Sequence, residues 1–260
     1  MKELRARIRK LVADFLIGLM FYTRLPLGGS ARDDISDFAR ASWTAPVVGA
    51  VVGILGAIAF DAASKMGLPP LPAAVIAVAT TLLLTGGLHE DGLADTADGF
   101  GGGATRERKL EIMRDSRIGT YGVCAVVISL MLRVSALAAL AGTAFIVPAL
   151  IASHTAARSL LPAFMYLMPP ARADGLSASA GRPPFAAVFV SVLIGLIALR
   201  LGLGASHAII AVALLIALAA IAALMSKRQI GGQTGDVLGA VEQAGEVLVL
   251  LVAVTLKIAI

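Results

Sequence analysis

The sequence predicts an all-α, polytopic integral membrane protein: a helical bundle of about seven transmembrane helices plus an N-terminal interfacial or re-entrant helix. Three observations predict this fold class. Hydrophobic residues make up 58% of the 260 residues and charged residues only 15%, whereas soluble domains average about 45–50% and 25%. The apolar residues form long runs that can cross the hydrocarbon core as helices. The basic residues gather between those runs, so we expect one membrane-embedded domain, residues 1–260.

Residues 1–42 are predicted to form a cytoplasmic or interfacial segment before the first span. Within it, residues 11–27 are largely apolar but contain Asp14, Arg24 and Pro26. This mixture is typical of a helix that lies in the membrane interface or re-enters it, rather than of a spanning helix. The basic residues before it could begin a signal peptide. No small-residue cleavage site follows, so we reject that interpretation.

Seven apolar runs then follow as predicted spans. The first two are uncharged and 18 residues long, which is enough to cross a bilayer with little tilt. The third contains Arg133, and the fourth contains His154 and Arg158. The predicted spans are residues 43–60, 71–88, 120–141, 145–168, 185–199, 206–225 and about 236–260.

The distribution of positive charge predicts the orientation. With a cytoplasmic N-terminus, residues 1–42 place eight Lys and Arg inside, residues 89–118 place five, and residues 169–184 and 226–235 place two each, so that 17 of 22 are inside. The outer side has three: Lys65, Arg200 and Lys257. This asymmetry follows the positive-inside rule and explains the basic composition without a nucleic-acid partner.

Residues 89–118 are expected to form a cytoplasmic catalytic loop. Four acids fall within nine residues at its start, and Asp91, Asp95 and Asp98 follow the spacing i, i+4, i+7. On a helix this spacing puts three carboxylates on one face, where they repel one another unless a cation lies between them. Hard cations such as Mg²⁺ take carboxylate oxygens and bridge to substrate phosphates. We therefore predict that the three aspartates are catalytic and bind Mg²⁺, with His89 hydrogen-bonded behind them. A solvated acidic helix end is the alternative.

Two arginines follow in the same segment. Arg114 and Arg117 lie one helical turn apart, with Asp115 between them. Arginine forks match phosphate oxygens bidentately, and phosphoryl transfer needs cationic groups that absorb developing negative charge. Arg114, Asp115 and Arg117 are therefore predicted to bind substrate. An amphipathic helix with ordinary cytoplasmic arginines is the alternative.

The glycine-rich turn at 231–235 leads into the last span, which contains two glutamates one turn apart. Ionisable groups near or within a span are costly unless they are paired or face a polar cavity. Glu242 and Glu246 are expected to form the deeper wall of the site or to pair with Arg133 or Arg158. Helix capping by Asp236 is the structural alternative. The substrate-binding residues predicted here are Arg158, Gln233, Asp236, Glu242 and Glu246.

Four motifs resemble the cobalamin synthase family, the adenosylcobinamide-GDP ribazoletransferases. They are residues 23–26, 89–98, 112–119 and 231–236, and the resemblance extends from about residue 15 to 250. Glu90 departs from it, since the family pattern has an apolar residue there. The resemblance implies that adenosylcobinamide-GDP reacts with α-ribazole, or its 5′-phosphate, to give adenosylcobalamin, or its 5′-phosphate, and GMP. It also implies Mg²⁺ and a cytoplasmic (inner) membrane location with the site facing the cytoplasm. Membrane lipid is an expected partner, nucleic acid is not, and a homo-oligomer is compatible with the sequence.

Two alternatives stay open at this point. A CDP-alcohol phosphatidyltransferase-like enzyme also uses an aspartate-rich motif for Mg²⁺, but the Ala-Arg pair and later Gly/Asp spacing expected of that family are missing. An ion-coupled transporter could line its path with the ionisable residues of the spans. Transporters usually contain internal repeats, and the sequence shows none.

Overall fold

The computed structural model describes residues 1–26 and 37–258, and these residues confirm the all-α fold class. Apart from helices, the described residues contain turns and a single isolated bridge between Pro170 and Gln233. The helices are α1 (Lys2–Tyr22), α2 (Phe38–Ala41), the 3₁₀ helix η1 (Ser42–Thr44), α3 (Ala45–Lys65), α4 (Pro70–Thr85), α5 (Leu88–Gly102), α6 (Arg106–Ile112), α7 (Thr120–Leu140), α8 (Ile146–Leu167), α9 (Leu176–Ala180), α10 (Phe185–Ile230) and α11 (Gly235–Ile258).

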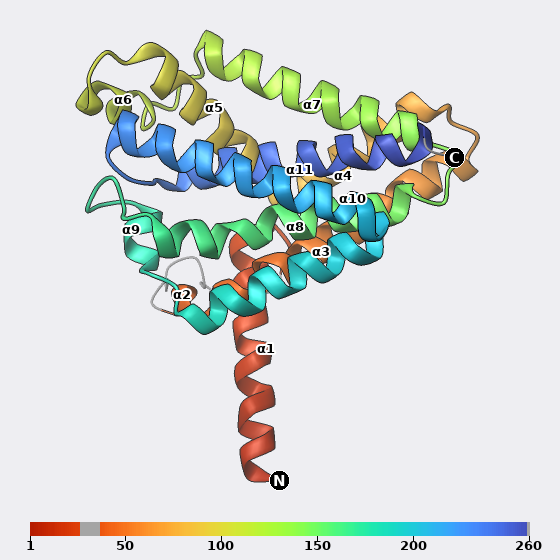
Figure 1. The fold of residues 1–260 in the computed structure, drawn as a ribbon, viewed down its shortest axis with the longest axis horizontal. Coiled ribbons are helices and arrows are strands. Elements are labelled where there is room, and N and C mark those ends of the chain that lie inside the picture. Colours follow the sequence, from red (N-terminus) through yellow and green to blue (C-terminus); the bar gives the residue numbers. More distant parts are fainter. Residues whose placement is uncertain (27–36, 259–260) are drawn as a thin grey trace.

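Helix α8 lies in the middle of the bundle, between α3, α10 and α11 (Figure 1). Small residues permit this close packing. A Cβ atom added at Gly53 of α3 would lie 2.7 Å from the backbone oxygen of Leu150 in α8, so no side chain fits there. In membranes, helices associate through such close contacts because lipid removes most of the hydrophobic driving force. The central position of α8 explains why its polar residues are buried inside the protein rather than exposed to lipid.

Four helical segments are long and apolar enough to cross a membrane: Phe38–Lys65, Thr120–Leu140, Phe185–Ile230 and Gly235–Thr255. Helices α4 and α5 would add a fifth span if they are counted together, although they are bent by 88° relative to each other. Even with this fifth span the count is lower than the seven predicted spans, for two reasons. Helix α8 is less apolar because it contains His154 and Arg158. The runs 185–199 and 206–225 both lie in α10, which breaks at Gly204 (φ +73°) and runs back beside itself (Figure 1).

Helix α1 stands at a steep angle to the bundle and projects away from it (Figure 1). It begins at Lys2 and ends at Tyr22, so it starts earlier than the predicted segment 11–27, whose last residue lies outside the described residues. Its first half exposes both apolar and basic side chains, as expected of an interfacial helix. Asp14 anchors it, because this buried carboxylate accepts hydrogen bonds from Arg40 and from Trp43 Nε1.

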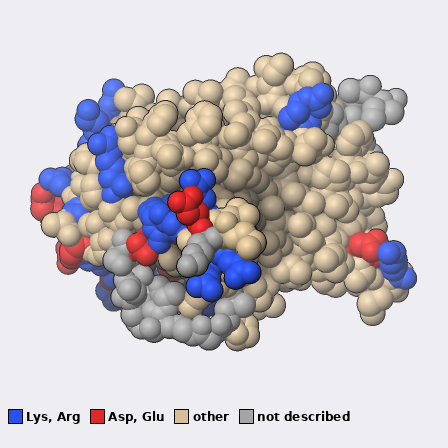
Figure 2. All heavy atoms as spheres, turned by 90° about the horizontal axis from the view of Figure 1, so that it is seen from below, with Lys and Arg blue, Asp and Glu red and all other residues tan. Residues whose placement is uncertain are grey.

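Charged side chains are unevenly distributed on the surface. Figure 2 shows most of them at one end of the bundle and around α1, a few at the other end, and a wide uncharged band between. An uncharged band flanked by charges is what a bilayer requires of a multi-pass protein. The structure therefore supports the membrane interpretation of the composition.

Candidate functional site

The predicted loop 89–118 is largely helical. Gly86 and Gly87 both have φ near +67°, a conformation that glycine adopts without steric cost, and they turn the chain sharply between α4 and α5. Helix α5 then packs against α7 and α11 instead of extending into solvent. The acidic motif therefore lies on a buried helix, which positions its carboxylates more rigidly than a loop would.

Helices α5 and α11 cross at two glycines, and this crossing assembles the candidate site. A Cβ atom on Gly92 would lie 2.8 Å from the backbone oxygen of Asp236, and one on Gly239 would lie 3.1 Å from the backbone oxygen of His89. The absence of side chains at both positions lets the two backbones touch. Asp236 is thereby brought next to the acidic face of α5.

We expect Gly92→Ala to disrupt this crossing. The new methyl group would push α5 away from α11, and overpacking of this kind typically costs about 1–3 kcal/mol. Thermal unfolding in detergent should therefore begin at lower temperature, and turnover should fall at least tenfold. Gly102→Ala is the matched control, because its Cβ would lie 3.5 Å from the nearest atom, the flexible tip of Ile112. A Gly92→Ala protein as stable and active as this control would show that the crossing tolerates a wider spacing.

Asp95 is the electrostatic centre of the site. It is half-buried, and the charges of Asp236, Asp91 and Asp98 all act on it unfavourably. Arg172 is the cation that counters them, and its Nη2 atom lies 4.0 Å from the Asp236 carboxylate. The Nη1 atom of Arg172 is buried without a hydrogen-bond partner. The site thus combines several carboxylates with an arginine that has a free donor.

The structure gives Asp98 a different environment from Asp91 and Asp95. Its side chain is buried, and its two oxygens accept backbone N–H bonds from Gly119 (2.7 Å) and Gly122 (2.9 Å). The first N–H groups of a helix lack partners within the helix, so Asp98 stabilises the start of α7. Asp98 still acts electrostatically on Asp95, as Asp91 does, so its predicted part in a metal site stays a prediction. Asp236 joins the three aspartates of α5 from α11.

Among the described residues, the three ligating side chains with atoms within 4.8 Å of one another are His154, Glu242 and Glu246, not the predicted aspartates. Those three residues are buried in ion pairs with arginines, so their charges are already compensated. The predicted aspartates are therefore more widely spaced than the ligands of a closed metal cage.

The structure does not bring Arg114 and Arg117 to the aspartates. Arg114 pairs with Asp174 at 2.6 Å, and Arg117 pairs with its neighbour Asp115 at 2.7 Å, both on the exposed surface. The Arg117 guanidinium lowers the pKa of Asp115 to about 2. Their predicted role in substrate binding stays a prediction, and the pairs observed in the structure hold loops together.

Two arginines that the motifs did not single out are closer to the site. One is Arg172, whose guanidinium lies 4.0 Å from the Asp236 carboxylate. Arg106 donates hydrogen bonds to the backbone oxygens of Ile230 (2.8 Å) and Ala171 (2.7 Å), and so ties the start of α6 to the loops that precede α9 and α11. In the sequence both residues contribute only to the cytoplasmic excess of charge, and no local pattern marks them.

Gln233 does not line the cavity of about 150 Å³ that lies between α1, α5, α8 and α11 next to the aspartates. Its side-chain oxygen accepts a hydrogen bond from Ser177 at 2.6 Å, and its backbone pairs with Pro169 and Ala171. Gln233 thus positions Ser177, which lines the cavity described below. Asp236 also lines that cavity, and its predicted contact with substrate stays a prediction. It is not the cap of α11, because Thr234 Oγ1 accepts the N–H of Val237.

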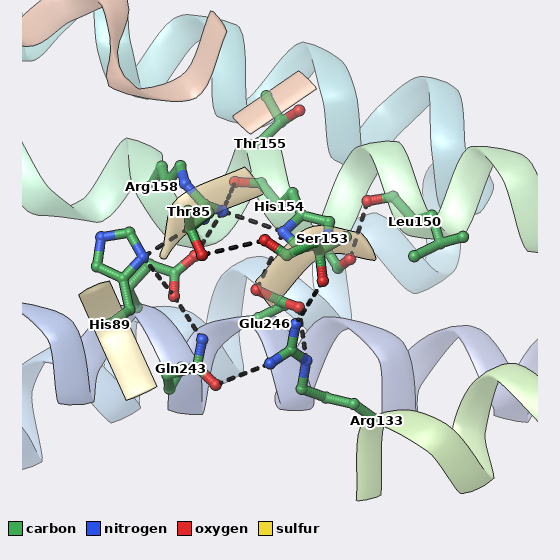
Figure 3. Close-up of polar contacts among 12 residues, drawn as sticks. Thr85, His89, Arg133, Leu150, Ser153, His154, Thr155, Arg158, Gln243 and Glu246 are labelled. Carbon is green, nitrogen blue, oxygen red and sulfur yellow. Dashed lines mark hydrogen bonds and ion pairs between the residues drawn. The ribbon is translucent and has the colours of Figure 1, made fainter. Parts of the chain in front are cut away.

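The ionisable residues of the spans form a buried network (Figure 3). Arg158 pairs with Glu242 at 2.5 Å, and Arg133 pairs with Glu246 at 2.8 Å. The predicted pairing of glutamates with span arginines is therefore confirmed. All four side chains are at most 2% exposed, and none of them lines the cavity. The predicted direct contact of Arg158, Glu242 and Glu246 with substrate does not fit this placement, because these groups bind one another.

His89 connects this network to the cavity. Its Nδ1 atom lies 3.2 Å from Glu242, while its ring lines the cavity floor. His154 lies 3.1 Å from Glu246 in the same way. Glu90 joins from the next position of α5, at 2.7 Å from Arg133. Burial in this network is the role that the structure gives to Glu90.

A cavity of about 150 Å³ lies beside the aspartates, between the end of α1 and helices α2, α5, α8, α9 and α11. Asp91, His89, Ser177 and Asp236 make up its polar wall. Carboxylates, an arginine with a free donor and an adjoining cavity are the parts that phosphoryl transfer requires: groups for a cation, a cationic group for phosphate, and room for a substrate.

Comparison with known proteins shows the family of the chain. A family model described as Cobalamin-5-phosphate synthase matches residues 14–254. The adenosylcobinamide-GDP ribazoletransferase of Bradyrhizobium diazoefficiens is 56% identical over 246 residues, which cover 95% of each chain. The enzymes of the same name from Mesorhizobium japonicum and Azorhizobium caulinodans are 49% and 46% identical and cover 94% of this chain. The aligned residues make up 94% of the Mesorhizobium japonicum enzyme and 96% of the Azorhizobium caulinodans enzyme.

No solved structure matches the chain. The family match covers the acidic helix, the glycine-rich turn and the last span, which are the elements that form the candidate site. The chain belongs to the cobalamin-5-phosphate synthase family.

Proposed function

We propose that this chain joins adenosylcobinamide-GDP to α-ribazole, or to α-ribazole 5′-phosphate, and releases GMP, in the assembly of the cobalamin nucleotide loop. The observation that carries the proposal is that Asp91 and Asp236 line one cavity, while Asp95 and Arg172 interact electrostatically with this pair of carboxylates. The family match supports this reaction and supports neither of the two alternatives, a CDP-alcohol phosphatidyltransferase or an ion-coupled transporter.

The same convergence fits Mg²⁺. The aspartates repel one another, and a divalent cation would remove that repulsion. Their wide spacing also fits, because Mg²⁺ keeps several waters and is usually bound through one or two carboxylates plus substrate phosphates. We propose Asp91 and Asp236, the two carboxylates that line the cavity, as the residues that would hold it. The ion would neutralise the charge of the diphosphate.

The chain's own residues supply the remaining functions. A ribose hydroxyl must attack phosphorus and lose its proton, and Asp95, half-buried between the other carboxylates, is the proposed acceptor. Arg172 can direct its unpaired Nη1 donor at a phosphate oxygen of the leaving GMP. Ser177 and His89 on the polar wall orient the hydroxyl-bearing substrate. Asp98 keeps α5 and α7 in place beneath these groups.

The assay that tests the proposal measures release of GMP. Membranes containing the protein should release GMP from adenosylcobinamide-GDP only when α-ribazole or its 5′-phosphate is added. A comparison of the two acceptors identifies the preferred one. Release of CMP from a CDP-alcohol, or no turnover at all with either acceptor, would contradict the proposal.

We further propose that the protein lies in the cytoplasmic (inner) membrane with the site facing the cytoplasm. Support comes from the 17-to-3 distribution of Lys and Arg and from the clustering of charge at one end of the bundle (Figure 2). Residues 169–184, with Arg172 and Ser177, belong to the basic side.

This topology predicts the labelling of single cysteines. In a Cys124→Ala background, Ser179→Cys should resist an impermeant thiol reagent in intact cells, while Met66→Cys should react. Both positions are exposed, so accessibility depends on the side of the membrane and not on burial. Permeabilised cells should label both, which controls for reactivity. Labelling of Ser179→Cys from outside would reverse the proposed orientation.

A further inference from the structure

The cavity beside the aspartates has aromatic lining residues that the transfer chemistry does not use. Phe21 and Tyr22 reach it from the end of α1, and Phe38 reaches it from α2. The ring centroids of Phe21 and Phe38 are 4.2 Å apart, and those of Tyr22 and His89 are 5.9 Å apart. Leu161 and Met165 of α8 complete the apolar wall, together with Ala180 and Leu238.

The aromatic lining suits a flat apolar ring. The whole cavity measures about 150 Å³, a volume at which apolar cavities of other proteins take up a benzene-sized ring. Aromatic side chains bind a further ring in offset or edge-to-face geometry. Met165 adds a flexible thioether, a group that adapts to the outline of a ligand. The lining formed by Phe21, Phe38 and Met165 therefore suits a planar, largely apolar ligand.

The polar lining restricts the ligand further. Asp91 and Asp236 belong to it, and Ser177 donates its hydroxyl to Gln233, so that the Ser177 oxygen can still accept a hydrogen bond. A ligand that matches both kinds of lining has an apolar ring joined to a group that carries hydroxyls. A nucleoside with a benzimidazole-type base has this form. Guanine is less suitable, because its polar edge would be buried without partners against aliphatic and aromatic side chains.

We propose that this aromatic cavity is the subsite for the base of the ribazole, and that Phe38 and Met165 determine which bases it accepts. The inference rests on the proposed function and adds the orientation of the acceptor. With the base between Phe38 and Met165, the ribose lies at the wall formed by Asp91 and Asp236, where its hydroxyl is to react. The guanosine part of the donor then binds outside this cavity.

The test uses two acceptors, the ribosides of benzimidazole and of the larger naphthimidazole, with the full chain in membranes. Met165→Ala should enlarge the cavity and shift the ratio of their kcat/KM values at least tenfold towards the larger base. This ratio is independent of how much enzyme is folded. Phe38→Ala should raise the KM for α-ribazole at least tenfold and leave the KM for adenosylcobinamide-GDP unchanged. Phe189→Ala, at an exposed phenylalanine of α10, is the matched control.

The outcomes separate the inference from the proposed function. No turnover by the unaltered protein would remove the proposed function itself. Normal turnover with an unchanged base ratio in Met165→Ala would overturn the subsite. If Phe38→Ala raises only the KM for adenosylcobinamide-GDP, guanine binds in the cavity and the proposal is contradicted. If kcat and KM are unchanged in both Phe38→Ala and Met165→Ala, neither substrate binds there; lipid is then the occupant, and the proposal is also contradicted.

Discussion

Asp95→Asn is expected to reduce turnover by about 10²–10³-fold, the loss that follows removal of a single charge-stabilising group at a reaction centre. Asparagine keeps the size of the side chain but cannot accept the hydroxyl proton. The repulsion that Asp95 experiences from Asp91 and Asp236 disappears in this variant, so the folded protein should be no less stable. Steady-state release of GMP in membranes, with the amount of folded protein measured in parallel, checks the expectation.

Two comparisons sharpen this experiment. Glu111→Gln removes an exposed carboxylate from the nearby α6 and should leave turnover unchanged. Asp98→Asn should act differently from Asp95→Asn, because it weakens the hydrogen bonds to Gly119 and Gly122 and so lowers the unfolding temperature. The concentration of Mg²⁺ needed for half-maximal rate should rise in Asp91→Asn and Asp236→Asn. Near-normal turnover of Asp95→Asn, with the Mg²⁺ dependence retained, would exclude Asp95 from the mechanism.

Much of this arrangement is predictable from the sequence because it depends on local composition. Long apolar runs must become helices in a bilayer, and this predicts the fold class. A buried ionisable residue in a span needs a partner or a polar cavity, and this predicts that Glu242 and Glu246 pair with Arg133 or Arg158 or form the deeper wall of the site. The structure shows the pairs. The acidic face of α5 follows from its spacing. In each case the physical rule acts within one segment or on a single buried group.

The remaining features depend on contacts between distant segments, which no local pattern contains. The spacing of Asp91, Asp95 and Asp98 is the same whether Asp98 faces a cation or the start of α7. Its hydrogen bonds to Gly119 and Gly122 arise only because α7 packs on α5. Arg172 enters the site because the turn at Gln233 pairs with the chain around Pro170.

The contacts of Arg133 account for the position of Glu90. In the buried network Arg133 and Arg158 pair with Glu90, Glu242 and Glu246. His89 and His154 each lie within 3.2 Å of a glutamate of the same network. Glu90 gives Arg133 a second carboxylate, and Gln243 and Thr81 accept further hydrogen bonds from its guanidinium. Glu90→Gln should therefore lower stability more than it lowers the rate of the folded enzyme.

Glu242→Gln is expected to produce the largest loss of stability. Glu242 is the carboxylate that pairs with Arg158, and both side chains are at most 1% exposed. Removing one partner of a buried ion pair leaves the other charge desolvated and uncompensated, which typically costs about 3–5 kcal/mol. Loss of the pair also frees His89, whose ring forms part of the cavity floor, so the affinity for the acceptor should fall in the fraction that remains folded.

A double variant distinguishes the effect of an uncompensated buried charge from the effect of losing the ion pair as a whole. Arg158→Met combined with Glu242→Leu replaces both charges by apolar side chains, and such exchanges are often neutral or stabilising because no charge remains to be desolvated. The double variant should therefore unfold at a higher temperature than Glu242→Gln alone. Asp61→Asn is the matched control, since Asp61 forms an exposed pair with Lys65 at the other end of the bundle and such pairs contribute about 0–1 kcal/mol. If Glu242→Gln unfolds at the temperature of this control, the network is not a source of stability, and Arg158 and Glu242 must be retained for contact with substrate instead.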